Sequence, residues 1–194
     1  MTDPALQSDN DALFAAAQVS PWTLREKAGR TLWMLVQATL FRWSFHNWYS
    51  WRAFLLRLFG GKVGGHVHIR STARIEIPWN LRIGDYSSIG DFAVVYCLGP
   101  VSIGRRATVS QYAHLCAGTH DFSRADMPLL RPPISIGDDA WIATDAFVGP
   151  GVVVGDGAIL GARASAFSAL DAWTIYAGNP ARALRPRPRP EPRP

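Results

Sequence analysis

The chain has 194 residues, nearly half of them apolar, and a formal net charge of +5. This is the length of one ordinary domain or slightly more, and its apolar fraction is enough for a sizeable core. From Arg182 onward there are five arginines and one glutamate, so +4 of the +5 belongs to this end of the chain. No aromatic stacking platform accompanies these arginines, so the charge does not indicate nucleic-acid binding.

Residues 1–20 are expected to form a flexible lead-in. The first eleven residues are acidic and polar rather than basic and then apolar, which argues against a signal peptide. The chain has two cysteines, Cys97 and Cys116, and we expect them to fill small spaces in the core or at corners. Together these features predict a cytoplasmic protein.

Residues 21–61 have a helical pattern. Ser20-Pro21 predicts an N-cap followed by proline at the first helical position, and a second helix is expected over 51–59, before Gly60-Gly61. Five of the eight tryptophans lie between Trp22 and Trp51, interleaved with arginine and lysine. Two interpretations stay open: a cap on the end of the next domain, or peripheral membrane contact through residues 22–59. The longest apolar stretch, 32–41, is too short to span a bilayer.

An aliphatic residue returns every six positions through the middle of the chain. The series is Ile83, Ile89, Val95, then Ile103, Val109, Leu115, then Ile136, Ile142, Val148, Val154 and Leu160, usually with a small residue four places later. A period of six is neither that of a helix nor that of a strand, and it is typical of a parallel β-helix. We therefore predict a β-helix over 62–177.

The repeat is interrupted in three places. The steps from Ile75 to Ile83 and from Val95 to Ile103 are eight residues long, which predicts two-residue bulges at corners. A polar segment with several prolines, about 121–133, predicts a loop that projects from the solenoid. After residue 177 we expect a turn, a short helix and a tail of alternating proline and arginine, together covering 178–194.

His120 is the candidate catalytic residue. It stands where the regular coil meets the projecting loop, so a general base could be held on a rigid wall and covered by a flap. Asp121 could orient the imidazole or contact substrate, although neighbours on an extended chain point apart. His66 and His68 have the spacing of a metal pair, but no third ligand lies nearby, and surface positions fit them better.

Several motifs carry a resemblance to a known family. Thr119-His120-Asp121 before an insertion, Ala140-Trp141-Ile142-Ala143, Val148-Gly149-Pro150-Gly151 and Gly178-Asn179-Pro180-Ala181 resemble the hexapeptide-repeat O-acetyltransferases of the left-handed β-helix superfamily. With the tryptophan-rich N-terminal segment, the chain is similar to the colanic acid biosynthesis acetyltransferases over about 21–185.

This resemblance implies a fold, a reaction and a set of site residues. The fold would be a left-handed parallel β-helix that forms a homotrimer, with each active site between two chains. Acetyl-CoA would be the co-substrate, with no metal, and His120 would be the general base. The backbone at Thr144 and Ala162 would hold the pantetheine arm, and Arg182 and Arg185 would meet the nucleotide phosphates. The acceptor would be a saccharide hydroxyl in exopolysaccharide biosynthesis. The aromatic, basic N-terminal segment would then bring this cytoplasmic protein to the inner face of the membrane.

Departures from the family pattern leave the acceptor open. Ser168 stands where the family often has a cofactor-binding lysine, and Gly90 and Leu98 stand where sugar-binding polar side chains lie in galactoside and maltose acetyltransferases. Three alternatives remain: N-acetylation of an amino sugar, a zinc enzyme like the γ-class carbonic anhydrases, and a non-catalytic β-helical scaffold.

Overall fold

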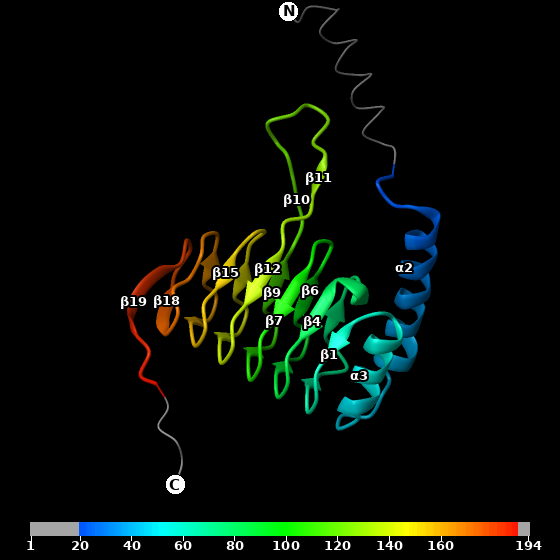
Figure 1. The fold of residues 1–194 in the computed structure, drawn as a ribbon, viewed down its shortest axis with the longest axis horizontal. Coiled ribbons are helices and arrows are strands. Elements are labelled where there is room, and N and C mark those ends of the chain that lie inside the picture. Colours follow the sequence, from blue (N-terminus) through cyan, green and yellow to red (C-terminus); the bar gives the residue numbers. More distant parts are fainter. Residues whose placement is uncertain (1–19, 190–194) are drawn as a thin grey trace, which may run out of the picture.

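Two helices precede a three-sided solenoid. The computed structural model describes residues 20–189 and begins with α2 (Leu24–Val36), which continues into a π-helical turn, η1 (Gln37–Phe41). Helix α3 (Tyr49–Leu58) follows, and the helices lie together at one end of the solenoid (Figure 1). The predicted lead-in, residues 1–20, lies outside the described residues except for Ser20.

Short strands in three sheets build the solenoid, and every pair in these sheets except β18 with β19 is parallel, which confirms the predicted parallel β-helix. Sheet A contains β1 (Lys62–Val63), β4 (Leu81–Ile83), β7 (Val101–Ile103), β12 (Ile134–Ile136) and β15 (Val153–Val154). Sheet B contains β2 (His68–Ile69), β5 (Ser88–Ile89), β8 (Thr108–Val109), β13 (Trp141–Ile142), β16 (Ile159–Leu160), β18 (Thr174–Ala177) and β19 (Arg182–Pro186). Sheet C contains β3 (Arg74–Ile75), β6 (Val94–Tyr96), β9 (His114–Cys116), β14 (Phe147–Val148) and β17 (Ser165–Ala166).

The six-residue aliphatic repeat forms the core. Along sheet B the register stacks Ile69, Ile89, Val109, Ile142 and Leu160, and every one of these side chains is fully buried. Each such side chain gains about 1.5–3 kcal/mol from leaving water. Because a residue stacks on its equivalents in neighbouring turns, the repeat fixes the register of the whole wall.

All extra residues of the irregular turns lie at one corner, between sheets C and A. In sheet A the paired residues Ile83 and Ile103 are 20 positions apart, Ile103 and Ile136 are 33 apart, and Ile136 and Val154 are 18 apart. A 3₁₀ turn, η2 (Pro78–Asn80), fills this corner in the first turn of the solenoid. The predicted bulges and the predicted loop are therefore successive widenings of one corner.

Side chains of α2 and η1 form hydrogen bonds with backbone groups at the open edge of sheet C. Trp33 donates its indole N–H to the carbonyl of Ile75 at 2.7 Å, and the Gln37 side-chain oxygen accepts from the Ile75 amide at 2.7 Å. Both backbone groups belong to β3, the first strand of the sheet, and no other strand of residues 20–189 lies on that side. Without these two side chains, the Ile75 amide and carbonyl would lose their partners.

Two arginines on α3 form hydrogen bonds with the first strands of sheets A and B. Arg57 donates to the carbonyl of Val63 on β1 at 2.9 Å, and Arg52 donates to the carbonyl of Ile69 on β2 at 2.6 Å. The Arg52 side chain is fully buried, and its other nitrogens bind oxygens of the turn before α3. The helices thus close the first turn of all three sheets.

Helix α2 begins later than the sequence pattern predicts. Its N-cap is Thr23, whose side-chain oxygen accepts from the Glu26 amide at 3.2 Å, while the Glu26 carboxylate accepts from the Thr23 amide at 2.8 Å. This reciprocal capping box satisfies two amides, whereas Ser20-Pro21 offers only one cap. No helix among residues 20–189 has the length and apolar run needed to cross a bilayer.

The predicted short helix near the C-terminus is wrong. Residues Arg182–Pro186 form strand β19, which pairs antiparallel with β18 and closes the far end of sheet B (Figure 1). Arg187 then donates to the carbonyls of Asp139 at 2.8 Å and Gly157 at 3.0 Å. An open edge on β18 offers more hydrogen bonds than an isolated helical turn can make, so the extended form is favoured.

Candidate active site

The projecting loop is a β-hairpin on the corner between sheets C and A (Figure 1). Strand β10 (Thr119–His120) pairs antiparallel with β11 (Leu129–Leu130), with His120 opposite Leu129. Beyond the pair, the Asp121 amide donates to the Pro128 carbonyl at 3.0 Å. Pairing with β11 and the Asp121 hydrogen bond therefore fix the backbone before and after His120, while the His120 side chain stays exposed.

The His120 imidazole is oriented by a backbone carbonyl. Its Nδ1 lies 2.6 Å from the carbonyl oxygen of Met127. A carbonyl oxygen only accepts, so Nδ1 carries the proton and Nε2 has the free lone pair. In this tautomer Nε2 can accept a proton from another group, as a general base must.

Met127 contributes a backbone group that sequence analysis missed. Its φ of 39° lies in the left-handed region, and its amide donates to the Arg124 carbonyl at 3.1 Å. This turn directs the Met127 carbonyl toward the imidazole. The contact involves no side chain of Met127, so the sequence carries no direct signal for it.

Asp121 does not orient His120 in this structure. Its carboxylate accepts from the Ser123 amide at 3.0 Å and from the Ser123 hydroxyl at 2.6 Å. These two hydrogen bonds lower the pKa of Asp121, because they stabilise the charged form. A second local pair, Arg124 with Asp126 at 2.8 Å, is bidentate. Asp121 thus shapes the first turn of the hairpin.

His120 lines a cavity of about 550 Å³ that the N-terminal segment helps to enclose. The hairpin, the widened corner and the segment around α2 all contribute to its lining, which is formed by Pro21, Trp22, Arg30, Tyr96, Leu98, His120, Asp126, Met127, Pro128 and Leu129. Sequence analysis assigned the N-terminal tryptophans and arginines to a cap or a membrane contact. Nothing in the sequence indicated that two of them, Trp22 and Arg30, also reach the catalytic candidate.

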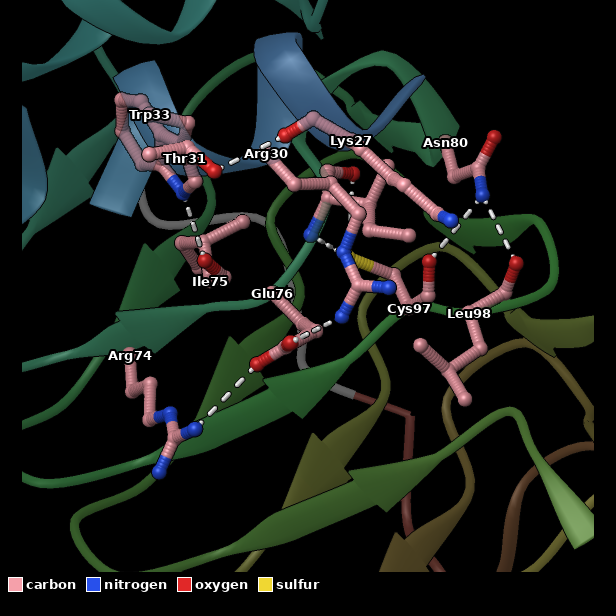
Figure 2. A network of polar contacts seen from close by, with 11 residues as sticks. Lys27, Arg30, Thr31, Trp33, Arg74, Ile75, Glu76, Asn80, Cys97 and Leu98 are labelled. Atoms are coloured by element: carbon pink, nitrogen blue, oxygen red, sulfur yellow. Dashed lines mark hydrogen bonds and ion pairs between the residues drawn. The ribbon is translucent and has the colours of Figure 1, made fainter. Parts of the chain in front are cut away.

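Trp22 connects helix α2 to the base of the hairpin. The Arg30 guanidinium carbon lies 4.3 Å from the ring centroid, and that of Arg131 lies 3.8 Å from it. Arg30 also binds Glu76 at 2.8 Å, as Figure 2 shows. Each cation over the ring contributes about 0.5–1 kcal/mol at an exposed site. These contacts hold one wall of the cavity against the hairpin.

Thr144 and Ala162 lie at a different corner, between sheets B and C. They occupy equivalent places in successive turns, and the Arg163 amide donates to the Thr144 carbonyl at 3.0 Å. Within residues 20–189 the amides of Thr144 and Ala162 donate to no protein group. Two free N–H groups, one turn apart, can therefore bind carbonyl oxygens of an extended ligand.

Arg182 and Arg185 lie on β19 at the end of the same side of the solenoid. Both side chains are exposed. Arg182 is opposite Ala177, and Arg185 is opposite Ile175, in the antiparallel pair with β18. Their guanidinium groups are therefore exposed to solvent, as binding to phosphate would require.

A single chain does not bring all the predicted site residues together. His120 extends from the corner between sheets C and A, whereas Thr144 and Ala162 lie at the corner between sheets B and C. Sheet C separates the two groups. Within one chain the predicted site residues therefore fall into two groups, each of which would be a half-site.

His114, on β9, has a different environment from His120. Its ring meets Tyr96 and Phe147 edge-on, with centroids 6.4 and 5.6 Å apart. Its Nε2 is buried without a hydrogen-bond partner in the described chain, and burial lowers its pKa. Burial therefore disfavours the charged form of His114. Within residues 20–189, no group of three or more histidine, cysteine, aspartate or glutamate side chains is placed to hold a metal ion.

Comparison with known proteins assigns the family. The chain is 48% identical over 156 residues to a protein of Escherichia coli (strain K12) named "Putative colanic acid biosynthesis acetyltransferase WcaF", covering 80% of this chain and 86% of that protein. The family model described as bacterial transferase hexapeptide (six repeats) matches residues 133–165. The chain belongs to the hexapeptide-repeat acetyltransferases.

Solved structures agree with this acetyltransferase fold. A hexapeptide-repeat acetyltransferase from Vibrio cholerae, complexed with acetyl coenzyme A, superposes with a TM-score of 0.79 at 21% identity, covering 88% of this chain and 93% of that one. A galactoside acetyltransferase in complex with coenzyme A gives 0.75 at 18% identity, covering 91% and 90%. At these identities the likeness concerns the fold, and the acyltransferase assignment rests on the E. coli relative.

Proposed function

We propose that this acetyltransferase transfers an acetyl group from acetyl-CoA to a sugar hydroxyl of an exopolysaccharide or its lipid-linked precursor, with His120 as the general base. The observation that carries the proposal is the hydrogen bond from Nδ1 of His120 to the Met127 carbonyl, in a side chain that lines a cavity. The name of the E. coli relative supports a polysaccharide acceptor.

His120 would move one proton twice. Its Nε2 takes the proton of the acceptor hydroxyl as that oxygen attacks the thioester carbonyl carbon. The carbon–sulfur bond then breaks, and the proton passes from Nε2 to the departing sulfur, so the imidazole returns to its starting form. A positioned base contributes roughly 10²–10⁴-fold to such a step. Holding the two reactants together can remove about 7–11 kcal/mol of barrier.

Residues of this chain fit a phosphate-bearing thioester. The free amides of Thr144 and Ala162 suit the amide carbonyls of a pantetheine arm, and the exposed Arg182 and Arg185 suit phosphates. Acetyl-CoA, when bound, supplies the activated acetyl group. The chain's own contribution is to hold this donor in an extended form beside the acceptor.

A homotrimer would complete the site. Because the two half-sites lie at different corners of one chain, the hairpin of one copy must lie along the corner between sheets B and C of the next copy. Three such head-to-tail contacts close into a ring. Apolar residues on the outer side of sheet C, including Tyr96, Phe147 and the 60% exposed Phe167, support a buried contact there.

The N-terminal helices are also proposed to touch the inner face of the membrane. Their inner sides cap the solenoid, while Leu24, Trp43 and Phe45 are 84%, 84% and 70% exposed. The basic residues Arg25 and Lys27 lie among them, which suits an anionic lipid surface. Sedimentation with phosphatidylglycerol and phosphatidylethanolamine vesicles should deplete the wild-type protein.

Matched variants make this membrane test specific. Trp43→Ser with Phe45→Ser should abolish binding to the vesicles. Phe122→Ser, at an 89% exposed site on the hairpin, should leave it unchanged. Equal depletion of all three proteins would reject membrane contact through the helices.

Two experiments test the enzymatic proposal. Purified protein with acetyl-CoA and saccharide acceptors should release coenzyme A thiol, and the product should carry an ester-linked acetyl group by mass spectrometry. An amide-linked product on an amino sugar would instead establish N-acetylation. Exopolysaccharide from cells without the gene should lack one acetyl group. Complete absence of thiol release with every saccharide offered would favour a non-catalytic scaffold.

A further inference from the structure

Two cations lie side by side on the outer face of sheet A. Lys62 on β1 and Arg82 on β4 are register partners, and both are exposed, while Val63 and Ile83 beside them are buried. Neighbouring strands are about 4.8 Å apart, so one small anion can contact both side chains. Like charges directly opposite each other on a sheet are destabilising. A bound anion at this pair would therefore stabilise the folded chain.

No described side chain neutralises the pair. Ser102, Ser135 and Val153 follow Arg82 along the same row of sheet A, and none of them is acidic. Within residues 20–189 neither Lys62 nor Arg82 forms an ion pair. Both charges are therefore left for solvent or for a ligand.

The pair borders a hollow of about 400 Å³ at the first turn of sheet A. Arg57 and Arg105 also line it, and Asp85 is its one carboxylate among the described residues. That carboxylate is already engaged, because one oxygen accepts from the Gly65 amide at 2.8 Å and the other lies 3.6 Å from Arg105. Arg57 uses Nε and Nη2 for backbone carbonyls, which leaves Nη1 for a ligand. Four cations around one engaged carboxylate favour a negatively charged ligand.

An apolar stripe on α3 lies beside the hollow. Trp51, Phe54 and Leu58 share one face of this helix, and Phe54 and Leu58 are 49% and 66% exposed. Arg57 connects the two surfaces, since it precedes Leu58 on the helix and lines the hollow, and Figure 1 shows α3 next to β1. A small free anion has no use for such a stripe. A lipid surface offers acyl chains to the stripe and charged headgroups to the hollow.

We infer that this hollow binds the phosphate of an anionic phospholipid headgroup, with Lys62 and Arg82 as its ligands and Arg57 at its edge. The inference rests on the membrane contact proposed above, and it gives that contact a second surface and a preferred headgroup charge. Guanidinium and ammonium groups bind phosphate oxygens strongly, and the planar fork of Arg82 can bind two of them. The contacts proposed between copies involve the hairpin, sheet C and the corner between sheets B and C, and not the first strands of sheet A.

Sedimentation with vesicles tests the headgroup site in the full chain. Wild-type protein should bind phosphatidylglycerol vesicles more tightly than phosphatidylcholine vesicles. Lys62→Gln with Arg82→Gln should weaken binding to phosphatidylglycerol roughly tenfold or more, whereas Lys62→Arg with Arg82→Lys keeps both charges and should bind normally. The control, Arg182→Gln with Arg185→Gln, removes the same charge at the other end of the solenoid and should bind as the wild type does. Equal affinity for both kinds of vesicle, or equal weakening in both glutamine variants, would overturn the inference.

Calorimetry distinguishes a lipid headgroup from a free anion. Monomeric dihexanoyl phosphatidylglycerol should bind the wild type more tightly than inorganic phosphate does, and Lys62→Gln with Arg82→Gln should lose this binding. Inorganic phosphate that binds equally tightly would refute the lipid assignment.

The same vesicles separate this site from the proposals on which it rests. Normal sedimentation of Lys62→Gln with Arg82→Gln, with loss in Trp43→Ser with Phe45→Ser, would refute the headgroup site and leave the membrane contact. The reverse pattern would support the headgroup site and refute contact through Trp43 and Phe45. None of these measurements involves turnover, so an inactive wild-type enzyme would refute the acetyl-transfer proposal alone.

Discussion

Nδ1 of His120 lies 2.6 Å from the carbonyl oxygen of Met127, seven residues further along the same hairpin. The hairpin therefore carries both the proposed base and the group that fixes its tautomer. Neither the solenoid nor the neighbouring Asp121 is needed for this orientation, since the Asp121 carboxylate is bound to Ser123. The conformation of the hairpin tip, rather than one more side chain, sets the direction of Nε2.

Substitutions at positions 120 and 127 should separate the base from its orienting group. His120→Ala should lower kcat roughly 10²–10⁴-fold with little change in the KM for acetyl-CoA. Met127→Ala keeps the carbonyl, so its kcat should stay within about threefold. Met127→Pro cannot adopt the φ of 39° and loses the amide bond to Arg124, so its kcat should fall toward that of His120→Ala. Steady-state kinetics measure all three. A fully active proline variant would contradict the orienting role of this carbonyl.

Trp22→Ala should damage acceptor binding more than donor binding. The ring lines the cavity beside His120 and lies under the guanidinium groups of Arg30 and Arg131. Its removal should raise the KM for the acceptor about tenfold, while the KM for acetyl-CoA stays constant. Losing two cation–π contacts should cost about 1–2 kcal/mol of unfolding free energy. Trp22→Phe retains a ring and should show smaller effects on both. Equal changes in the two KM values would count against this location of the acceptor.

The sequence predicted the solenoid well because its repeat is a packing requirement. Ile69, Ile89 and Val109 stack on one another, so a substitution at any of them disturbs its neighbours in two turns. The two eight-residue steps and the insertion were also visible, since they break this period. The sequence did not show that these three interruptions lie at the same corner. The period gives the spacing along the chain, but it does not assign each step to a sheet.

The site was less predictable because it depends on backbone groups and on distant segments. The sequence carries no signal for the contact of the Met127 carbonyl with His120. Trp22 lines the same cavity as His120 although about half of the chain lies between them in sequence. The C-terminal strand was wrongly predicted as a helix for a similar reason: the open edge of β18 that stabilises Arg182–Pro186 exists only in the folded sheet. Thr144 and Ala162 remain predictions that a bound donor must test.

Cys97 should make stability depend on pH in the alkaline range. Its thiol is fully buried, and burial raises its pKa from 9.0 to about 11. A raised pKa means that the folded chain holds this proton more tightly, so the stabilisation is complete below pH 9 and is lost as the pH rises through 11. The loss should be about 2–3 kcal/mol. Urea unfolding between pH 8 and 11 should show it, and Cys97→Ala should have a correspondingly shallower decline. The same slope in both proteins would contradict the assignment to this thiol.

Mixing two inactive variants should restore activity if the site is shared between chains. His120→Ala removes the base, and Ala162→Phe blocks the corner between sheets B and C, where Ala162 is exposed. Each homotrimer should be inactive, since every site has one defective half. After co-refolding, some sites should combine an intact hairpin from one copy with an intact corner from another. Because a mixed trimer pairs neighbours in one direction only, about a quarter of the sites should be intact in a random equimolar mixture. Activity near that fraction of the wild type would establish a site between two chains. No recovery, in a mixture that light scattering shows to be trimeric, would place the whole site within one chain.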